Sequence, residues 1–354
     1  MTASYLSLAS DQWVCRPENK LTNYCTAVCQ EGTNKIQWHA FDSVWCSDAR
    51  YSDACKPPPP YIPYNDFHLK SWTEAERIPK PCESLKVTKA DKFKISVGIL
   101  ARGNELETLQ LSVNSWVQFQ LFDYVDEIIF MINEKSEEML NYIEDEILSK
   151  RKYNVRVLAS ETNVGILNGI NYLLGNATNE YMLFLEKDFR LVEPIGCTVE
   201  QIRAGLNLLS SKKADVVKYR SRHNPGRPNW ADVTYRGRED DVFGIQPNLL
   251  CNFYHWIDDP DKRWPNHFKV CSSDPTFYCV DSEFCNWTNN PFIISKYWWF
   301  EQYVFKFPEI ANSPPDFNLE GFMNWHPGAW NTRKFTVAEG DGLFKHCDAN
   351  NFGQ

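Results

Sequence analysis

Four short apolar runs, separated by segments of helix length, constrain this chain more than any other feature of its sequence. The runs are KISVGILA (94–101), EIIFMI (127–132), VRVLAS (155–160) and YMLFLE (181–186). Runs of this length and composition are typical of buried strands. Strands that alternate with helices form βαβ units, so the sequence predicts an α/β fold built on a mostly parallel, twisted sheet with helices on both faces. The expected helices cover 106–120, 134–150 and 163–177.

The pattern divides the chain into three regions. Residues 1–90 are irregular and contain the stiff spacer KPPPP (56–60), which predicts a cysteine-rich N-terminal arm or subdomain. Residues 91–192 hold the alternating strands and helices. In residues 193–354 the pattern loosens, although a helix (199–210), a strand (214–222) and a strand that enters a helix (291–305) are predicted.

Composition narrows the classes of function. The chain has 354 residues, of which 43% are apolar, so it is long and apolar enough for a substantial core. Its formal charge of -9 argues against a nucleic-acid partner. No apolar run approaches the roughly 18 residues of a membrane helix, so we expect no membrane segment within this chain.

Cysteine usage points to an oxidising compartment. The chain has 12 cysteines, mostly in loop-rich surroundings, and this favours disulfides over zinc. Two sequons for N-glycosylation begin at Asn176 and Asn286. We therefore expect the lumen of the Golgi or endoplasmic reticulum, or secretion, with or without a membrane anchor outside this chain.

The fourth apolar run ends abruptly in Glu186-Lys187-Asp188. Parallel α/β sheets bind their ligands at the carboxyl ends of their strands. Two carboxylates at such an edge are suited to hold a divalent metal ion and the phosphates that the ion neutralises. The alternative is a solvated strand end at which Lys187 pairs with one of the acids.

Residues 94–191 resemble the nucleotide-sugar half of a GT-A glycosyltransferase of the family 2-like type. The resemblance rests on the order and spacing of three segments: the turn Arg102-Gly103-Asn104-Glu105, the segment Asn163-Val164-Gly165 with a following Asn168 or Asn171, and the Asp-x-Asp position, here Glu186-Lys187-Asp188. The resemblance implies that 91–192 binds a UDP- or GDP-linked sugar and that 193–354 binds a glycan or glycoprotein acceptor. The donor-binding residues that it implies are Ala101, Arg102, Asn104, Glu105, Asn133, Asn163, Gly165, Asn168, Glu186, Lys187 and Arg220.

The resemblance also implies a metal ion, Mn²⁺ or Mg²⁺, bridging the carboxylates and the diphosphate of the donor. Asp188 is expected to bind it directly, with Glu186 as a second ligand or as a contact to the sugar or ribose. His346, in the C-terminal segment GDGLFKHCD, is expected to complete the coordination. The departures from the family pattern are Glu186 at the first acidic position and Asn133-Glu134 at the end of the second strand. These departures leave the nucleobase open.

An inverting member of this family needs a general base that deprotonates the acceptor hydroxyl. Glu320, in the segment NLEGFMNW, is the first candidate, and Glu301, in YWWFEQY, is the second. A Glu in the first turn of a helix is also favoured by the helix dipole alone.

Lys218, Arg220 and Arg222 face the same side of a predicted strand. They either receive a diphosphate or an acidic acceptor, or protect an exposed edge strand.

The resulting prediction is a metal-dependent hexosyl- or pentosyltransferase. Two alternatives are a sugar-phosphate nucleotidyltransferase and a catalytically inactive carbohydrate-binding protein on the same fold.

Overall fold

The computed structural model describes residues 26–30, 35–39, 80–150, 152–226, 235–310 and 313–347. The chain forms two compact units, residues 1–73 and 74–354. In the first unit, β1 (Thr26–Gln30) pairs antiparallel with β2 (Lys35–His39). The remainder of the predicted cysteine-rich arm, up to residue 79, lies outside the described residues.

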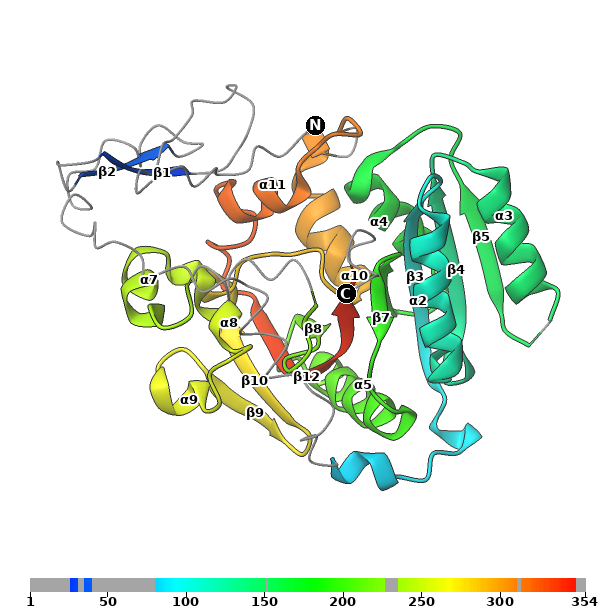
Figure 1. Ribbon diagram of the computed structural model, residues 1–354, viewed down its shortest axis with the longest axis horizontal. Coiled ribbons are helices and arrows are strands. Elements are labelled where there is room, and N and C mark those ends of the chain that lie inside the picture. Colours follow the sequence, from blue (N-terminus) through cyan, green and yellow to red (C-terminus); the bar gives the residue numbers. More distant parts are fainter. Residues whose placement is uncertain are drawn as a thin grey trace. The chain divides into compact units, whose positions relative to one another are not determined.

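The second unit is built on a mixed sheet that begins with the four strands predicted from the apolar runs. They are β3 (Phe93–Arg102), β4 (Val125–Asn133), β5 (Val155–Ala159) and β6 (Tyr181–Glu186). They lie in the order β5-β4-β3-β6 and all pair in parallel. Figure 1 shows β5, β4 and β3 side by side. Their carboxyl ends therefore share one edge of the sheet.

Helices connect these strands as the sequence predicts. They are α2 (Leu106–Gln118), α3 (Glu137–Ile143), which continues as a π-helical turn (Glu144–Leu148), and α4 (Gly165–Asn176). Side chains of β4 alternate between two cores. Ile128 and Phe130 pack with α2 and α3, whereas Ile129 and Met131 pack with α4. The prediction of helices on both faces is thus confirmed.

The rest of the sheet continues from β6 in the order β11-β8-β12-β10-β9, and β7 pairs with β12. Strands β7, β10 and β11 run opposite to all the others, so the α/β, mostly parallel prediction is confirmed with an antiparallel contribution from the second half. The bounds are β7 (Phe189–Leu191), β8 (Val216–Arg220), β9 (Lys269–Ser273), β10 (Thr276–Asp281), β11 (Phe292–Ser295) and β12 (Thr336–His346).

The long helix of the second half, α5 (Ile195–Ser210), packs in the same core as α2. The other helices of this half are short: α7 (Glu239–Ile245), α8 (Leu250–Phe253), α9 (Pro260–Arg263), α10 (Lys296–Trp299) and α11 (Leu319–Trp325). Single turns of 3-10 or π helix lie at Pro81–Ser84, Lys89–Asp91, Leu121–Asp123, Pro247–Leu249, Ser282–Phe284, Phe300–Val304 and Pro308–Ile310.

Disulfides tie the second unit together, as cysteine usage predicts. The pairs within the described residues are Cys82–Cys197, Cys251–Cys285 and Cys271–Cys279, and Cys347 has no disulfide partner there. Of the two sequon asparagines, Asn176 is exposed but Asn286 is buried. The helices described here are all too short or too polar to cross a membrane.

Candidate functional site

The Glu186-Lys187-Asp188 segment lies at the carboxyl edge of the parallel strands. Glu186 is the last residue of β6 and pairs with Leu100 of β3, whose carbonyl accepts a hydrogen bond from the Lys187 amide at 3.1 Å. The chain then turns into β7, which pairs antiparallel with the end of β12. The backbone therefore confirms the prediction that Glu186 and Asp188 lie where a strand ends at the edge of the sheet.

The end of β12 brings His346 beside Asp188, although the two are distant in sequence. Phe189 pairs with His346, and the Cys347 amide donates a hydrogen bond to the Asp188 carbonyl at 2.7 Å. The His346 Nε2 atom lies 3.5 Å from Asp188 Oδ2. Pairing of β7 with β12 is thus what joins two of the three predicted metal ligands.

The Asp188 carboxylate is nearly enclosed and only partly satisfied. Its Oδ2 atom lies 3.3 Å from Lys187 Nζ, whereas its buried Oδ1 atom has no hydrogen-bond partner among the described residues. Burial alone would raise the pKa of Asp188, but hydrogen bonding to His346 and the charge of Lys187 outweigh burial and lower it. Asp188 is therefore ionised at neutral pH, with one acceptor oxygen unused.

Glu186 lies in a region of concentrated negative charge. Burial raises its pKa, and so do the carboxylates of Asp188, Glu320 and Glu105, while Lys187 opposes them. Lys187 Nζ lies 3.4 Å from Glu105 Oε1, so this one ammonium contacts acids on both sides. The fold thereby gathers three predicted site carboxylates, those of Glu105, Glu186 and Asp188, around Lys187, and a further cation would reduce their mutual repulsion.

Asp188 and His346 fit a divalent cation by ligand type, by proximity and by the unused Oδ1 oxygen. Glu186 does not join them in a group whose ligand atoms all lie within 4.8 Å of one another. Mg²⁺ in phosphate-binding sites is commonly held by one or two carboxylates together with substrate phosphates. The Asp188 carboxylate, with the His346 imidazole beside it, therefore suffices for an ion that a diphosphate also binds.

A different group of three residues within the described part of the chain does meet this distance criterion. It consists of Cys251, Cys285 and Glu339. Its two cysteines form a disulfide, and Lys218 Nζ lies 3.2 Å from Cys285 Sγ and 3.5 Å from Glu339 Oε1. An ammonium thus already supplies the positive charge at this position.

The predicted donor-binding residues at the ends of β3 and β4 make contacts within the carboxyl edge of the sheet. Ala101 is buried in β3, Arg102 Nε donates to Glu134 Oε2 at 2.9 Å, and Asn104 is exposed in the turn before α2. Asn133 Oδ1 accepts from the Val164 amide at 2.6 Å. The end of β4 is thus tied to the start of α4.

The Asn163-Val164-Gly165 segment fits closely against a later loop. Asn163 Oδ1 accepts from Asn133 Nδ2 and from the Gly165 amide, both at 2.9 Å. Gly165 has φ +79°, and a Cβ atom there would lie 2.8 Å from the Pro315 carbonyl oxygen. Asn168 Nδ2 donates to the Ser313 carbonyl at 3.3 Å. These residues dock the 313–315 loop, which precedes α11.

The two candidate general bases lie in different surroundings. Glu320, in the first turn of α11, is half-buried, and its Oε1 atom accepts from the Asn289 amide at 2.8 Å. Burial raises the pKa of Glu320, against the opposing effects of that hydrogen bond and of Lys218 and Arg220. Glu301 instead lies beside the exposed Tyr297, whose pKa its charge raises. Glu320 is thus the candidate that influences Glu186.

The basic residues of β8 and of the loop that follows it are buried or half-buried. Strand β8 lies between β11 and β12, so the alternative that it is an exposed edge strand is wrong. Lys218 and Arg222 are buried, and Arg222 Nε donates to the Tyr254 carbonyl at 2.8 Å. Arg220 donates to the carbonyls of Pro225 and Gly226, at 2.9 Å and 3.3 Å.

The carbonyl groups to which Arg220 donates belong to the loop that holds His346, one of the predicted metal ligands. The Pro225 carbonyl also accepts from the His346 amide at 3.1 Å, and a Cβ atom on Gly226 would lie 1.8 Å from the His346 carbonyl oxygen. Arg220 therefore supports the loop against which His346 is held. Sequence reasoning did not identify this role, because no local pattern pairs a strand residue with loop carbonyls.

The lowered pKa of His255 predicts that the free energy of unfolding depends on pH. Burial, together with the charges of Arg220, Lys218 and Arg222, lowers this pKa from 6.5 to about 3. Its Nδ1 atom is buried without a hydrogen-bond partner among the described residues. Between pH 6.5 and 3 the unfolded chain thus binds a proton that the folded chain does not, so acidification favours unfolding.

We expect the free energy of unfolding to fall by up to about 2 kcal/mol between pH 7 and pH 5 through this residue alone. Urea titrations at both pH values measure the loss, and His255→Gln provides the comparison because glutamine does not titrate. The variant should lose less stability than the wild type over this interval. Equal losses in the two proteins would contradict the assignment.

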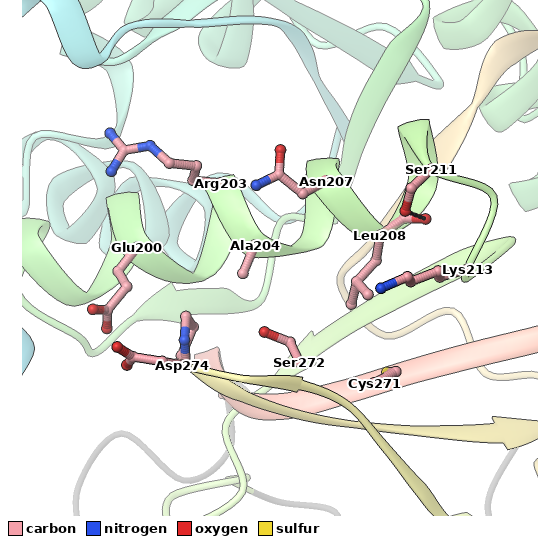
Figure 2. Close-up of a pocket in the computed structure, with 11 residues that line it drawn as sticks. Glu200, Arg203, Ala204, Asn207, Leu208, Ser211, Lys213, Cys271, Ser272 and Asp274 are labelled. Carbon is pink, nitrogen blue, oxygen red and sulfur yellow. Dashed lines mark hydrogen bonds between the residues drawn. The ribbon is translucent and has the colours of Figure 1, made fainter.

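A cavity of about 360 Å³ lies between α5 and the β9–β10 turn, away from these residues. Figure 2 shows Glu200 and Asp274 facing each other at one end of it, with Asn207 and Ser272 farther along. Burial raises the pKa of Glu200, and the charge of Asp274 adds to this effect. No predicted site residue lines this cavity.

Comparison with known proteins gives structural likeness only. No family model and no curated protein sequence matches the chain. Among solved structures, the chain is similar to S. aureus TarS 1-349, with 14% identity over 72% of this chain and a TM-score of 0.42. The same protein in complex with UDP-GlcNAc gives 15% identity over 72% of this chain and a TM-score of 0.42. The matches cover 60% and 59% of the lengths of those two TarS chains.

Proposed function

We propose that this protein is a glycosyltransferase that moves a sugar from a UDP- or GDP-linked donor to a hydroxyl of a glycan or glycoprotein. The observation that carries the proposal is the carboxyl-edge cluster of Asp188, His346 and Glu186, with Glu320 close enough to influence the pKa of Glu186. The buried, unpartnered Asp188 Oδ1 atom supports a cation at this edge. A nucleotide diphosphate is the substrate group that such a cation neutralises.

Asp188 and His346 are the residues that would hold Mn²⁺ or Mg²⁺. When bound, the ion would supply positive charge that stabilises the departing diphosphate. Lys187 brings a positive charge of its own to the same edge, where it contacts Asp188 and Glu105. Its ammonium offsets part of the carboxylate repulsion, so the edge can accept the negatively charged donor.

Glu320 is the proposed general base in a single displacement that inverts the anomeric carbon. The acceptor hydroxyl gives its proton to the Glu320 carboxylate, and its oxygen forms a bond to the anomeric carbon. The bond from that carbon to the phosphate oxygen breaks at the same time, and the nucleoside diphosphate leaves with the electron pair. A carboxylate whose pKa is raised by burial is a better proton acceptor than an ordinary glutamate.

We propose a secretory-pathway location for the protein. The support is the set of disulfides Cys82–Cys197, Cys251–Cys285 and Cys271–Cys279, because such bonds persist in oxidising compartments.

Release of nucleoside diphosphate from a panel of UDP- and GDP-sugars tests the proposed activity, first without an acceptor and then with a mixed glycan panel. We expect release with one donor in the presence of Mn²⁺ and its loss in EDTA. Glycan binding without release from any donor would instead indicate a carbohydrate-binding protein on this fold. Release of inorganic pyrophosphate from a nucleoside triphosphate and a sugar phosphate would indicate a nucleotidyltransferase.

A further inference from the structure

The helix that carries Glu320 is held by a pair of hydrogen bonds from a second residue on the same face. Asn324 follows Glu320 by four positions in α11, so the two side chains lie one turn apart on one side of the helix. Asn324 Oδ1 accepts from the Trp287 amide at 2.6 Å, and Asn324 Nδ2 donates to the Trp287 carbonyl at 2.9 Å. The asparagine thus satisfies both backbone groups of a single residue.

The segment that receives these bonds, residues 285–290, is fixed from several directions. Its first residue, Cys285, forms a disulfide with Cys251, and the Asn286 carbonyl accepts from the buried Lys218 Nζ at 3.0 Å. The Trp287 side chain is 1% exposed and packs against Trp299 and Trp330. The segment is therefore a rigid surface against which α11 can be oriented.

The same segment contacts the candidate base directly. Two residues beyond Trp287, the Asn289 amide donates to Glu320 Oε1 at 2.8 Å. Leu319 and Met323 of α11 are also buried in the core. The two Asn324 bonds add a polar attachment one turn beyond the Asn289 bond, so they help to set the rotation of the helix against segment 285–290.

A helix as short as α11, with seven residues, has little stability of its own in water. Its orientation therefore depends on contacts with its surroundings. We propose that Asn324 is a positioning residue that holds the Glu320 carboxylate toward the acceptor hydroxyl, an inference that rests on the proposed function. Asn324 itself contacts neither donor nor acceptor in this proposal.

Asn324→Ala tests the proposal, and Asn318→Ala is the matched control. Asn318 is the N-cap of the same helix, where its Oδ1 atom accepts from the Gly321 amide at 2.8 Å, and it makes no hydrogen bond to segment 285–290. Loss of the cap lowers the stability of the helix without removing its attachment. Both variants are compared with the wild type for kcat of transfer, donor KM, acceptor-free donor hydrolysis and melting temperature.

We expect Asn324→Ala to lower kcat for transfer on the order of 100-fold, because a small displacement of a catalytic group has effects of this size. Donor KM should stay within about threefold of the wild type, since the proposed metal ligands and donor contacts lie outside α11. Acceptor-free hydrolysis should fall together with kcat, because the attacking water needs the same base. Asn318→Ala should lower the melting temperature but keep kcat within about threefold. Equal losses of kcat in the two variants would show that kcat depends on the stability of α11 and not on the Asn324 hydrogen bonds.

Asn324→Asp serves if the alanine variant does not fold. It retains the acceptor for the Trp287 amide but loses the donor to the Trp287 carbonyl, so we expect a fall in kcat in this variant too. Wild-type kcat in either Asn324 variant would overturn the inference, provided that Glu320→Gln is impaired. Wild-type kcat in Glu320→Gln would instead overturn the assignment of the base, and so the proposed mechanism itself.

Discussion

Replacing Asp188 by asparagine is expected to lower the rate of sugar transfer on the order of 1,000-fold. The substitution keeps the shape of the side chain but removes the charge that lies beside His346 and Lys187. Without that charge, the edge would lose its principal ligand for a divalent ion. Steady-state kinetics at saturating Mn²⁺ and in its absence measure the effect.

The fold should survive this change, because Lys187 retains its contact with Glu105 and the Asp188 backbone retains its bond to Cys347. Asp126→Asn is the matched control. Asp126 lies near the start of β4, at the opposite edge of the sheet, where it pairs with Lys92 at 3.7 Å. The control should transfer sugar at the wild-type rate. Near-wild-type transfer by the Asp188 variant would remove Asp188 from the mechanism.

Glu320→Gln is expected to lower kcat for transfer by about 100- to 10,000-fold, the usual contribution of a general base. Glutamine can still accept the hydrogen bond from the Asn289 amide through its carbonyl oxygen, so α11 should stay in place. The glutamine cannot take up the acceptor proton. Donor KM should therefore change little while kcat falls, and initial-rate kinetics over a range of donor concentrations separate the two quantities.

Glu301→Gln distinguishes the two candidate bases in the same assay. Glu301 lies beside the exposed Tyr297, whose pKa its charge raises, whereas the charge of Glu320 raises the pKa of Glu186. A large loss of kcat in the Glu301 variant with little loss in the Glu320 variant would transfer the role of base to Glu301.

The first half of the fold could be predicted from sequence because its signals are local. Each apolar run is long enough to mark a strand, and the helices between the runs leave few ways to order the strands. The position of Glu186 and Asp188 at a sheet edge follows from this arrangement. The predicted strands β3 to β6 and the connecting helices are present in the structure.

The second half could be predicted only in part, because tertiary contacts determine it. Nothing local in the sequence shows that β8 lies in the interior between β11 and β12, and a strand with three cationic side chains was also consistent with an exposed edge. Lys218 and Arg222 are instead buried, with partners on distant segments. The charges of these residues are satisfied by a carboxylate and by carbonyl groups that sequence spacing does not identify.

The residues of the candidate site also divide into those that could be predicted from local sequence and those that could not. Its acids were recognised from their place after a strand, whereas the contacts that arrange them come from chain segments far away. Arg220 supports the loop beside His346, and Asn324 holds the helix of Glu320. Such positioning residues have no motif of their own, because each recognises backbone groups whose location depends on the whole fold.

Calorimetric titration with UDP- and GDP-sugars tests the central claim most directly, namely that the carboxyl edge around Asp188 binds a nucleotide sugar together with a divalent ion. We predict that one donor binds to the wild type in the presence of Mn²⁺, and that its binding is lost in EDTA and in Asp188→Asn. Binding of that donor with the same affinity in EDTA and in the variant, or binding of no nucleotide sugar under any of these conditions, would contradict the claim.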